Sequence, residues 1–220
     1  MANVHDKIIK MAAKEVLAPL GVFQKGQSRT WIDDNGWFFT IIEFQPSQWG
    51  KGAYLNVGMH FLWNSKDSFS FDYGGREHEN VSYTGDDEKF YKEMLELARL
   101  AKEKVMFYRS FSALSFAKGQ ITKNHVHSQE MDLWNSMMIC FLSSDFEHGR
   151  HFFQQVVNIT KDDYRGWVQA MNDQSTHQIA PILSHHERLQ KYVFASIQEG
   201  RCCWRGKSSM SKLKVDERFG

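Results

Sequence analysis

Apolar and polar residues alternate with a period of two over residues 53–63, where the chain reads AYLNVGMHFLW. Five apolar side chains fall on one side of such a strand, and they are Leu55, Val57, Met59, Phe61 and Trp63. Another apolar run, WFFTIIEF, precedes it at residues 37–44. Since Asp34-Asn35-Gly36 is a typical hairpin turn, we expect a first strand over residues 28–33 before it. The pattern therefore predicts a three-stranded antiparallel meander with one buried face.

Segments whose apolar residues have helical spacing lie on both sides of this region in the sequence. Residues 4–18 form one such segment, which Pro19 and Gly21 end. From Asp86 to Tyr108 the apolar residues fall three or four apart, which predicts a long helix. Ser128 is a good N-cap for a further helix that reaches Ser143. Shorter helices are expected over residues 145–159 and 161–172, and a last helix has Pro181 in its first turn and Gly200 at its end.

The order of these segments predicts an α+β fold with an N-terminal helix, a small antiparallel β-meander and a helical C-terminal half packed on it. Residues 64–85 have room for one or two further strands at the sheet edge. We expect a single domain over residues 1–200, made of a helix and sheet part (1–85) and a helical part (86–200). Residues 201–220 have little pattern and are expected to form a mobile tail.

Composition narrows the class of protein. The chain has 220 residues, of which 42% are hydrophobic, so it can bury a substantial core. Its 27 basic and 26 acidic residues give a net charge of +1, which provides no overall attraction for nucleic acid or an anionic membrane. An odd number of cysteines, three, and the lack of a signal peptide or membrane span favour a reducing, cytoplasmic location. The sequence contains no cofactor-binding motif, so we expect no cofactor.

The N-terminal segment resembles a known family. A helix ending in LAPLG, then FQKGQSRTWI, then FTIIEFQPSQWGKG and YLNVGMHF, is similar to the domain of unknown function 4304 family over roughly residues 5–63. Val22 stands directly after the glycine, where the family usually has the phenylalanine that is here Phe23. The resemblance implies a small bacterial protein, and some members are associated with toxin immunity or defence.

Polar residues of the predicted meander are the candidate binding residues. Glu43 and Gln45 should share a face with Asn56 and His60, and Arg29 joins them if its register fits. A solvated sheet face is the simpler interpretation of the same residues. Outside the sheet, Trp49 in its loop and Trp204 in the tail are candidate anchors for a partner.

Two other chemistries are open, and a third, a histidine metal site, is not supported. Asp33 or Asp34 followed by Glu43 resembles the metal-binding acids of restriction-endonuclease-like nucleases, although Gln45 stands where they have lysine. Histidines at 125, 127, 148, 151, 185 and 186 lack a known zinc spacing, so no metal site is predicted. A small-ligand sensor would use Gln45, Asn56 and His60.

The leading hypothesis is a cytoplasmic interaction protein, associated with immunity or defence, whose partner is another protein. It rests on the abundant aromatic residues, the near-neutral charge and the lack of a catalytic motif. The alternatives are the metal-dependent nuclease and the small-ligand sensor. The sequence leaves the oligomeric state open.

Overall fold

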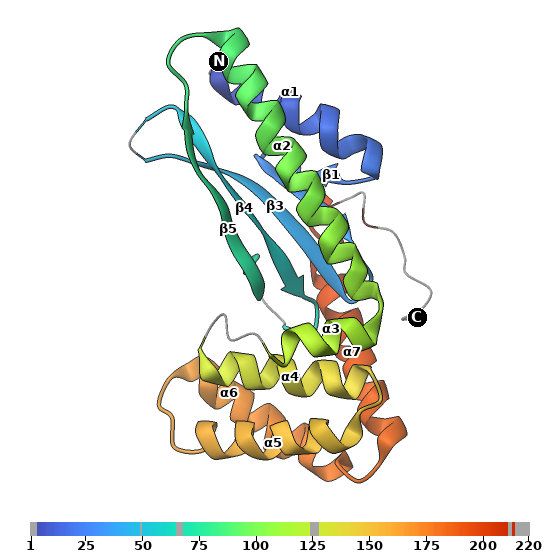
Figure 1. Cartoon of the computed structure of the whole chain (residues 1–220). Helices are drawn as coiled ribbons and strands as arrows, with labels where there is room; N and C mark the ends of the chain where they lie inside the picture. Colours follow the sequence, from blue (N-terminus) through green and yellow to red (C-terminus); the bar gives the residue numbers. More distant parts are fainter. Residues whose placement is uncertain (1–3, 49, 65–67, 124–127, 211–212, 214–220) are drawn as a thin grey trace.

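One antiparallel sheet forms the centre of the protein, with its strands in the order β1-β2-β3-β4-β5. A computed structural model describes residues 4–48, 50–64, 68–123, 128–210 and 213. The strands are β1 (Phe23–Gln24), β2 (Thr30–Asp34), β3 (Phe38–Pro46), β4 (Gly52–Phe61) and β5 (Tyr73–Ser82). Helices α1 (Val4–Leu17) and α2 (Asp87–Arg109) pack together on one face of this sheet (Figure 1).

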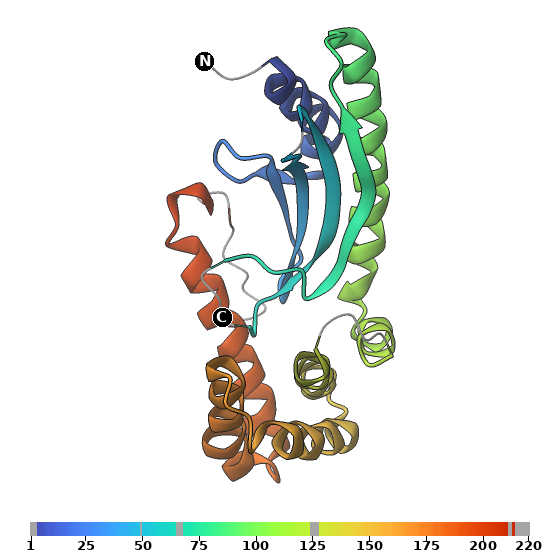
Figure 2. The same cartoon turned by 90° about the vertical axis from the view of Figure 1, so that its left-hand side faces the viewer.

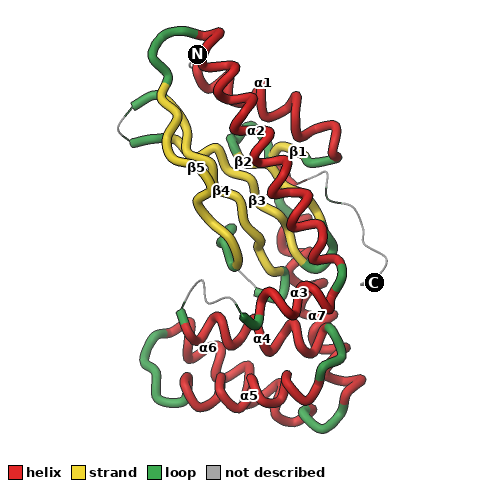
Figure 3. Tube along the Cα trace, viewed as in Figure 1, coloured by secondary structure: helices red, strands yellow, loops and turns green. Residues whose placement is uncertain are grey.

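The helical part lies beyond one end of the strands (Figure 3). It contains α3 (Leu114–Ile121), α4 (Gln129–Leu142), α5 (Phe146–Thr160), α6 (Gly166–Gln174) and the start of α7 (His186–Arg205). Short helical turns lie at Ala18–Leu20, Ser110–Ser112, Ser175–Ile179, Ala180–Ile182 and Ser208–Met210. The predicted α+β fold class is confirmed. None of the described helices is long and apolar enough to cross a membrane.

The hairpin that the sequence predicts joins β2 to β3. Gly36 has a φ of +86°, which its lack of a side chain permits, and its N–H donates to Asp34 Oδ1 at 3.1 Å. The five predicted core residues are buried, because Leu55, Val57, Met59 and Phe61 of β4 are fully buried and Trp63, which follows the strand, is 3% exposed. Burial does not alternate along β4, however, since Asn56 and His60 of the other face are buried as well.

Two edge strands complete the meander. Strand β5 pairs with β4 and provides one of the further strands expected within residues 64–85. Strand β1 was not predicted, because only two residues of it pair with β2. Such a short segment has no periodicity that a sequence pattern can reveal.

The last helix departs from its prediction at both ends. Pro181 lies in a separate short turn, and α7 begins at His186. Gly200 does not end the helix, which continues to Arg205. A Cβ atom at Gly200 would lie 2.0 Å from the carbonyl oxygen of Leu62, so the glycine allows α7 to cross the end of β4 closely.

The predicted start of a tail at residue 201 is therefore wrong, because residues 201–205 belong to α7. Trp204 is only 2% exposed, and its ring stacks on Phe69 with the centroids 3.9 Å apart. It is a core residue and not an exposed anchor for a partner. Figure 2 shows this end of α7 on the face of the sheet opposite α2.

Two neighbouring aspartates fix helices on the two faces of the sheet. Arg109 of α2 donates to Asp33 Oδ2 through Nε at 2.9 Å and to Asp33 Oδ1 through Nη2 at 2.6 Å. Arg201 of α7 donates to both oxygens of Asp34, at 2.8 and 2.7 Å, and to the carbonyl of Gly36 at 2.7 Å. Successive residues of a strand point to opposite faces, so each aspartate holds a different helix.

Replacing Arg201 with methionine tests this connection. The change leaves the Asp34 carboxylate without its arginine in a largely buried position, which costs about 3–5 kcal/mol of the free energy of unfolding. The exposed Arg188 of the same helix provides the control, because Arg188→Met makes the same chemical change in solvent. Urea unfolding measures both. Equal stability of the two variants would remove the proposed role of Arg201.

A pair of glycine substitutions tests the close approach of α7 to β4. Gly200→Ala should destabilise the protein although alanine favours helix, because the added methyl group collides with the Leu62 carbonyl. Gly119→Ala in α3 has open space around the new methyl group and should stabilise by about 0.5–1 kcal/mol. Thermal unfolding measures both changes, and shifts of the same sign would contradict the described packing.

Candidate functional site

A cleft of about 820 Å³ lies where the end of the sheet meets α4 and α6. We call it the tryptophan cleft, because three of the twelve described residues that line it are tryptophans. The lining residues are Trp63, Asn64, Ser70, Phe71, Asp72, Ser128, Met131, Trp134, Trp167, Ala170, Met171 and Gln174. Both its volume and its mainly apolar walls are typical of small-molecule binding sites.

Helical periodicity supplies one wall of the cleft. Residues 167, 170, 171 and 174 of α6 recur at the spacing that brings side chains to one helix face. On α4, Ser128, Met131 and Trp134 recur three apart. Ser128 also begins that helix, as predicted, since its hydroxyl accepts the Met131 N–H at 3.4 Å. The remaining lining residues come from the end of β4 and the segment before β5.

Two asparagines hold the indole N–H groups of the buried tryptophans. Trp63 Nε1 donates to Asn135 Oδ1 at 3.0 Å, and Trp134 Nε1 donates to Asn64 Oδ1 at 3.1 Å. Asn64 Nδ2 also donates to Asn135 Oδ1, at 3.2 Å. The polar edges of both indoles are thus satisfied within the protein, which fixes the orientation of the rings.

Among the described residues of the lining, Asp72 is the only ionisable one. The residue is 4% exposed, and its carboxylate accepts hydrogen bonds from the Phe61 N–H and the Ser70 hydroxyl, each at 2.8 Å. These two hydrogen bonds fix the position of the carboxylate. His60 Nδ1 lies 3.5 Å from Asp72 Oδ2. These contacts tie the segment before β5 to the end of β4.

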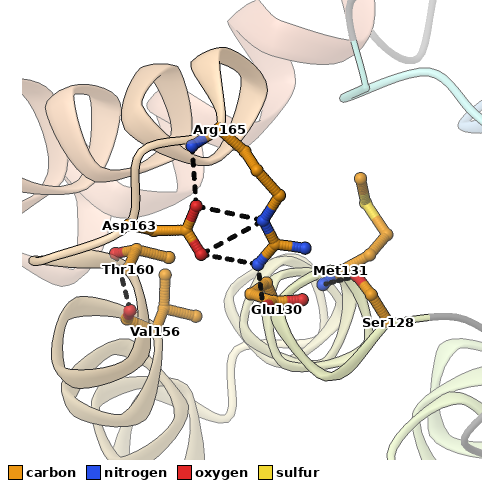
Figure 4. A network of polar contacts seen from close by, with 7 residues as sticks. All are labelled: Ser128, Glu130, Met131, Val156, Thr160, Asp163 and Arg165. Carbon is orange, nitrogen blue, oxygen red and sulfur yellow. Dashed lines mark hydrogen bonds and ion pairs between the residues drawn. The ribbon is translucent and has the colours of Figure 1, made fainter.

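An ion-pair network supports the rim of the cleft (Figure 4). Arg165 donates to Glu130 Oε1 at 2.5 Å and to Asp163 Oδ2 at 2.6 Å. The Arg165 guanidinium lowers the pKa of Asp163, and the backbone N–H of Glu130 together with Arg165 lowers the pKa of Glu130. The guanidinium carbon lies 5.1 Å from the ring centre of Trp167. The network thereby links the first turn of α4 to the α6 wall.

The predicted polar cluster on the sheet forms in part. Asn56 lies opposite Glu43 on β3, and its side-chain N–H group donates to Glu43 Oε2 and Gln45 Oε1, each at 2.9 Å. The sequence did not reveal Arg76, which donates to Asn56 and Gln45 and lies 4.2 Å from the ring centre of Tyr54. These side chains hydrogen-bond to one another, and their role in binding a partner stays a prediction.

Arg29 and His60 do not join the polar cluster. Arg29 lies opposite Phe44, and it donates to Asp6 of α1 at 2.6 Å. Glu43 pairs with Thr30, the residue next to Arg29, so Arg29 and Glu43 point to opposite faces of the sheet. His60 shares the face of Asn56 but is fully buried against Phe69 and Trp204.

The other candidate residues fall into two groups. Trp49, His125 and His127 lie outside the described residues. Asp34 and Glu43 share a face, but they are four strand positions apart, which corresponds to about 13 Å, and Asp34 is bound by Arg201. The structure does not bring these two carboxylates together. Over the described part of the chain, no group of three or more histidine, cysteine, aspartate or glutamate side chains could hold a metal ion.

Comparison with known proteins adds no relative: no family model, curated protein or solved structure matches this chain. The resemblance of residues 5–63 to the domain of unknown function 4304 family therefore stays a prediction. The tryptophan cleft was not predicted either, since its residues come from three regions that are distant in sequence.

Proposed function

We propose that this protein binds a small, largely apolar ligand in the tryptophan cleft. The observation that carries the proposal is the cleft itself, which has about 820 Å³ and is walled by Trp63, Trp134 and Trp167. Ligand sites are commonly found where two parts of a fold meet, and they combine apolar walls with a few polar groups. This function agrees in kind with the small-ligand sensor considered from the sequence. The proposed binding residues, however, are not the predicted Gln45, Asn56 and His60.

The chemistry of the lining favours binding over catalysis. A general acid–base reaction uses a group that can exchange a proton near its reacting atom, and Asp72 is the one ionisable residue among the described residues of the lining. That carboxylate already accepts two hydrogen bonds from the protein. The other polar lining residues are Asn64, Ser70, Ser128 and Gln174, which are suited to orient a ligand.

Filling the cleft tests the proposal. Ala170 lines the cleft and is exposed, so Ala170→Trp places an indole in the binding space without removing core packing. We expect wild-type protein to bind the neutral fluorophore N-phenylnaphthylamine saturably and Ala170→Trp to bind it at least about tenfold more weakly. Fluorescence titration measures both affinities.

The neighbouring residue provides a matched control. Gln169 is exposed on the same helix but does not line the cleft, so Gln169→Trp adds the same side chain elsewhere and should bind like wild type. The proposal is refuted if the wild-type protein does not bind the fluorophore. It is also refuted if Ala170→Trp binds the fluorophore with the same affinity as Gln169→Trp.

A protein-interaction role is the second candidate, and an exposed apolar patch favours it. Met106, Phe107 and Phe116 are 51%, 44% and 37% exposed, and the two phenylalanine rings are 6.3 Å apart. Adjacent exposed aromatic residues are typical of binding surfaces for other proteins. The immunity or defence association has only the family resemblance as its support.

Charge substitutions in this patch test the second candidate. The double variant Met106→Glu and Phe116→Glu should lose co-purification with a co-expressed product of a neighbouring gene, because a glutamate must lose its hydration in such an interface. Met11→Glu, at an apolar residue of α1 that is 53% exposed, is the control and should retain the partner. Failure of every neighbouring product to co-purify with wild type would refute this role.

A further inference from the structure

Asn35 is the one asparagine of the chain that precedes a glycine. Such a pair can react in water, because a glycine has no side chain to keep its backbone nitrogen away from the amide carbon of the preceding asparagine. The Gly36 nitrogen forms a bond to Asn35 Cγ, the bond from Cγ to Nδ2 breaks, and ammonia leaves with the proton of the Gly36 nitrogen. Water then opens the resulting cyclic imide to aspartate or isoaspartate.

In the folded protein, the hairpin between β2 and β3 holds both reacting nitrogens. Asn35 Nδ2, which would leave, donates to the carbonyl oxygen and Oδ2 of Asp33 at 3.2 and 3.1 Å and to Thr40 Oγ1 at 3.1 Å. The Gly36 nitrogen, which would attack, donates to Asp34 Oδ1 at 3.1 Å. The reaction requires these contacts to break, so a closed hairpin slows it.

The two oxygens that hold these nitrogens also bind the arginines of the flanking helices. Asp33 Oδ2 accepts from Arg109 Nε of α2 at 2.9 Å, and Asp34 Oδ1 accepts from Arg201 Nη1 of α7 at 2.8 Å. The protection of the dipeptide and the attachment of both helices therefore use the same carboxylates. Separation of β2 from β3 disturbs both.

Neither product of the reaction can restore the closed hairpin. An aspartate at position 35 would place a carboxylate oxygen against the carbonyl and carboxylate of Asp33, which only accept hydrogen bonds. Isoaspartate adds a carbon to the main chain at the residue whose N–H donates to the carbonyl of Phe38 at 3.0 Å. Since the turn sets the register of a hairpin, the longer main chain displaces β3 relative to β2.

We propose that Asn35 is a deamidation site that the closed hairpin protects and that opening of the hairpin exposes. The covalent change makes the opening irreversible, because the product cannot remake the contacts next to Asp33 and Asp34. The inference is independent of the proposed ligand-binding function. It assigns to the hairpin a limit on the lifetime of a protein molecule that has opened there.

A comparison of folded and unfolded wild type tests the protection. The full chain is incubated at neutral pH in buffer and in concentrated urea, and mass spectrometry of the peptide that contains Asn35 measures the rate of deamidation. We expect a rate at least about tenfold lower in buffer, because the reaction then requires local opening. Equal rates in the two conditions, or no reaction in urea, would overturn the proposal.

Two threonine substitutions separate the hairpin contact from a general loss of stability. Thr40→Val removes one acceptor of Asn35 Nδ2 and keeps the shape of a fully buried side chain, so folded protein should deamidate about threefold faster. Thr160→Val removes a buried hydroxyl of α5 that donates to the Val156 carbonyl, and it should deamidate like wild type. Circular dichroism checks that both variants fold. Equal rates in the two folded variants contradict the role of the hairpin contacts.

A mimic of the aspartate product tests the irreversible step. Asn35→Asp should unfold at a lower urea concentration than wild type, because the carboxylate cannot donate to Asp33 or Thr40. Asn158→Asp makes the same change at an exposed residue of α5 and serves as the control. If the two variants have the same urea midpoint, deamidation does not prevent closure and the proposal is overturned.

Discussion

The paired aspartates at the end of β2 are the constraint on which the arrangement of helices depends. Asp33 and Asp34 point to opposite faces of the sheet, and each carboxylate is bound through both oxygens by an arginine, Arg109 of α2 or Arg201 of α7. One dipeptide thereby fixes a helix on each face. Since α7 also packs against α4, its position at the hairpin determines where the helical part meets the ends of the strands. The tryptophan cleft lies at this junction.

Local patterns predicted the elements of the fold well. Apolar runs with a period of two and an Asn35-Gly36 turn suffice for the central strands, because apolar pattern and turn chemistry are both properties of short segments. The same reasoning failed at Gly200, where glycine is an ordinary helix-end signal but serves here for close packing against Leu62. A sequence pattern cannot distinguish these two uses, because the second depends on a contact between residues distant in the chain.

The site was less predictable for the same reason. Glu43, Gln45 and Asn56 were correctly placed together, since strand register relates residues of adjacent strands by simple counting. The face of Arg29 depends on how β2 aligns with β3, and the sequence of one strand alone does not define this register. In the structure Arg29 faces α1. The cleft depends on how α4 and α6 lie against the sheet end. Each of its tryptophans has the spacing of an ordinary core residue, so no local signal marks Trp134 or Trp167 as part of a site.

The two walls of the cleft are held by interactions of different strength. Buried hydrogen bonds through Asn64 and Asn135 fix the wall that contains Trp63 and Trp134, and breaking one of them leaves an indole N–H unsatisfied at a cost of about 1–3 kcal/mol. The α6 wall is supported at its rim by Arg165, whose side chain is 38% exposed, and ion pairs so accessible to water contribute little. The ion pairs at the rim therefore contribute less than the buried hydrogen bonds of the opposite wall, and α6 is held mainly by its buried Val168 and Met171. A ligand that contacts both walls would stabilise their present separation.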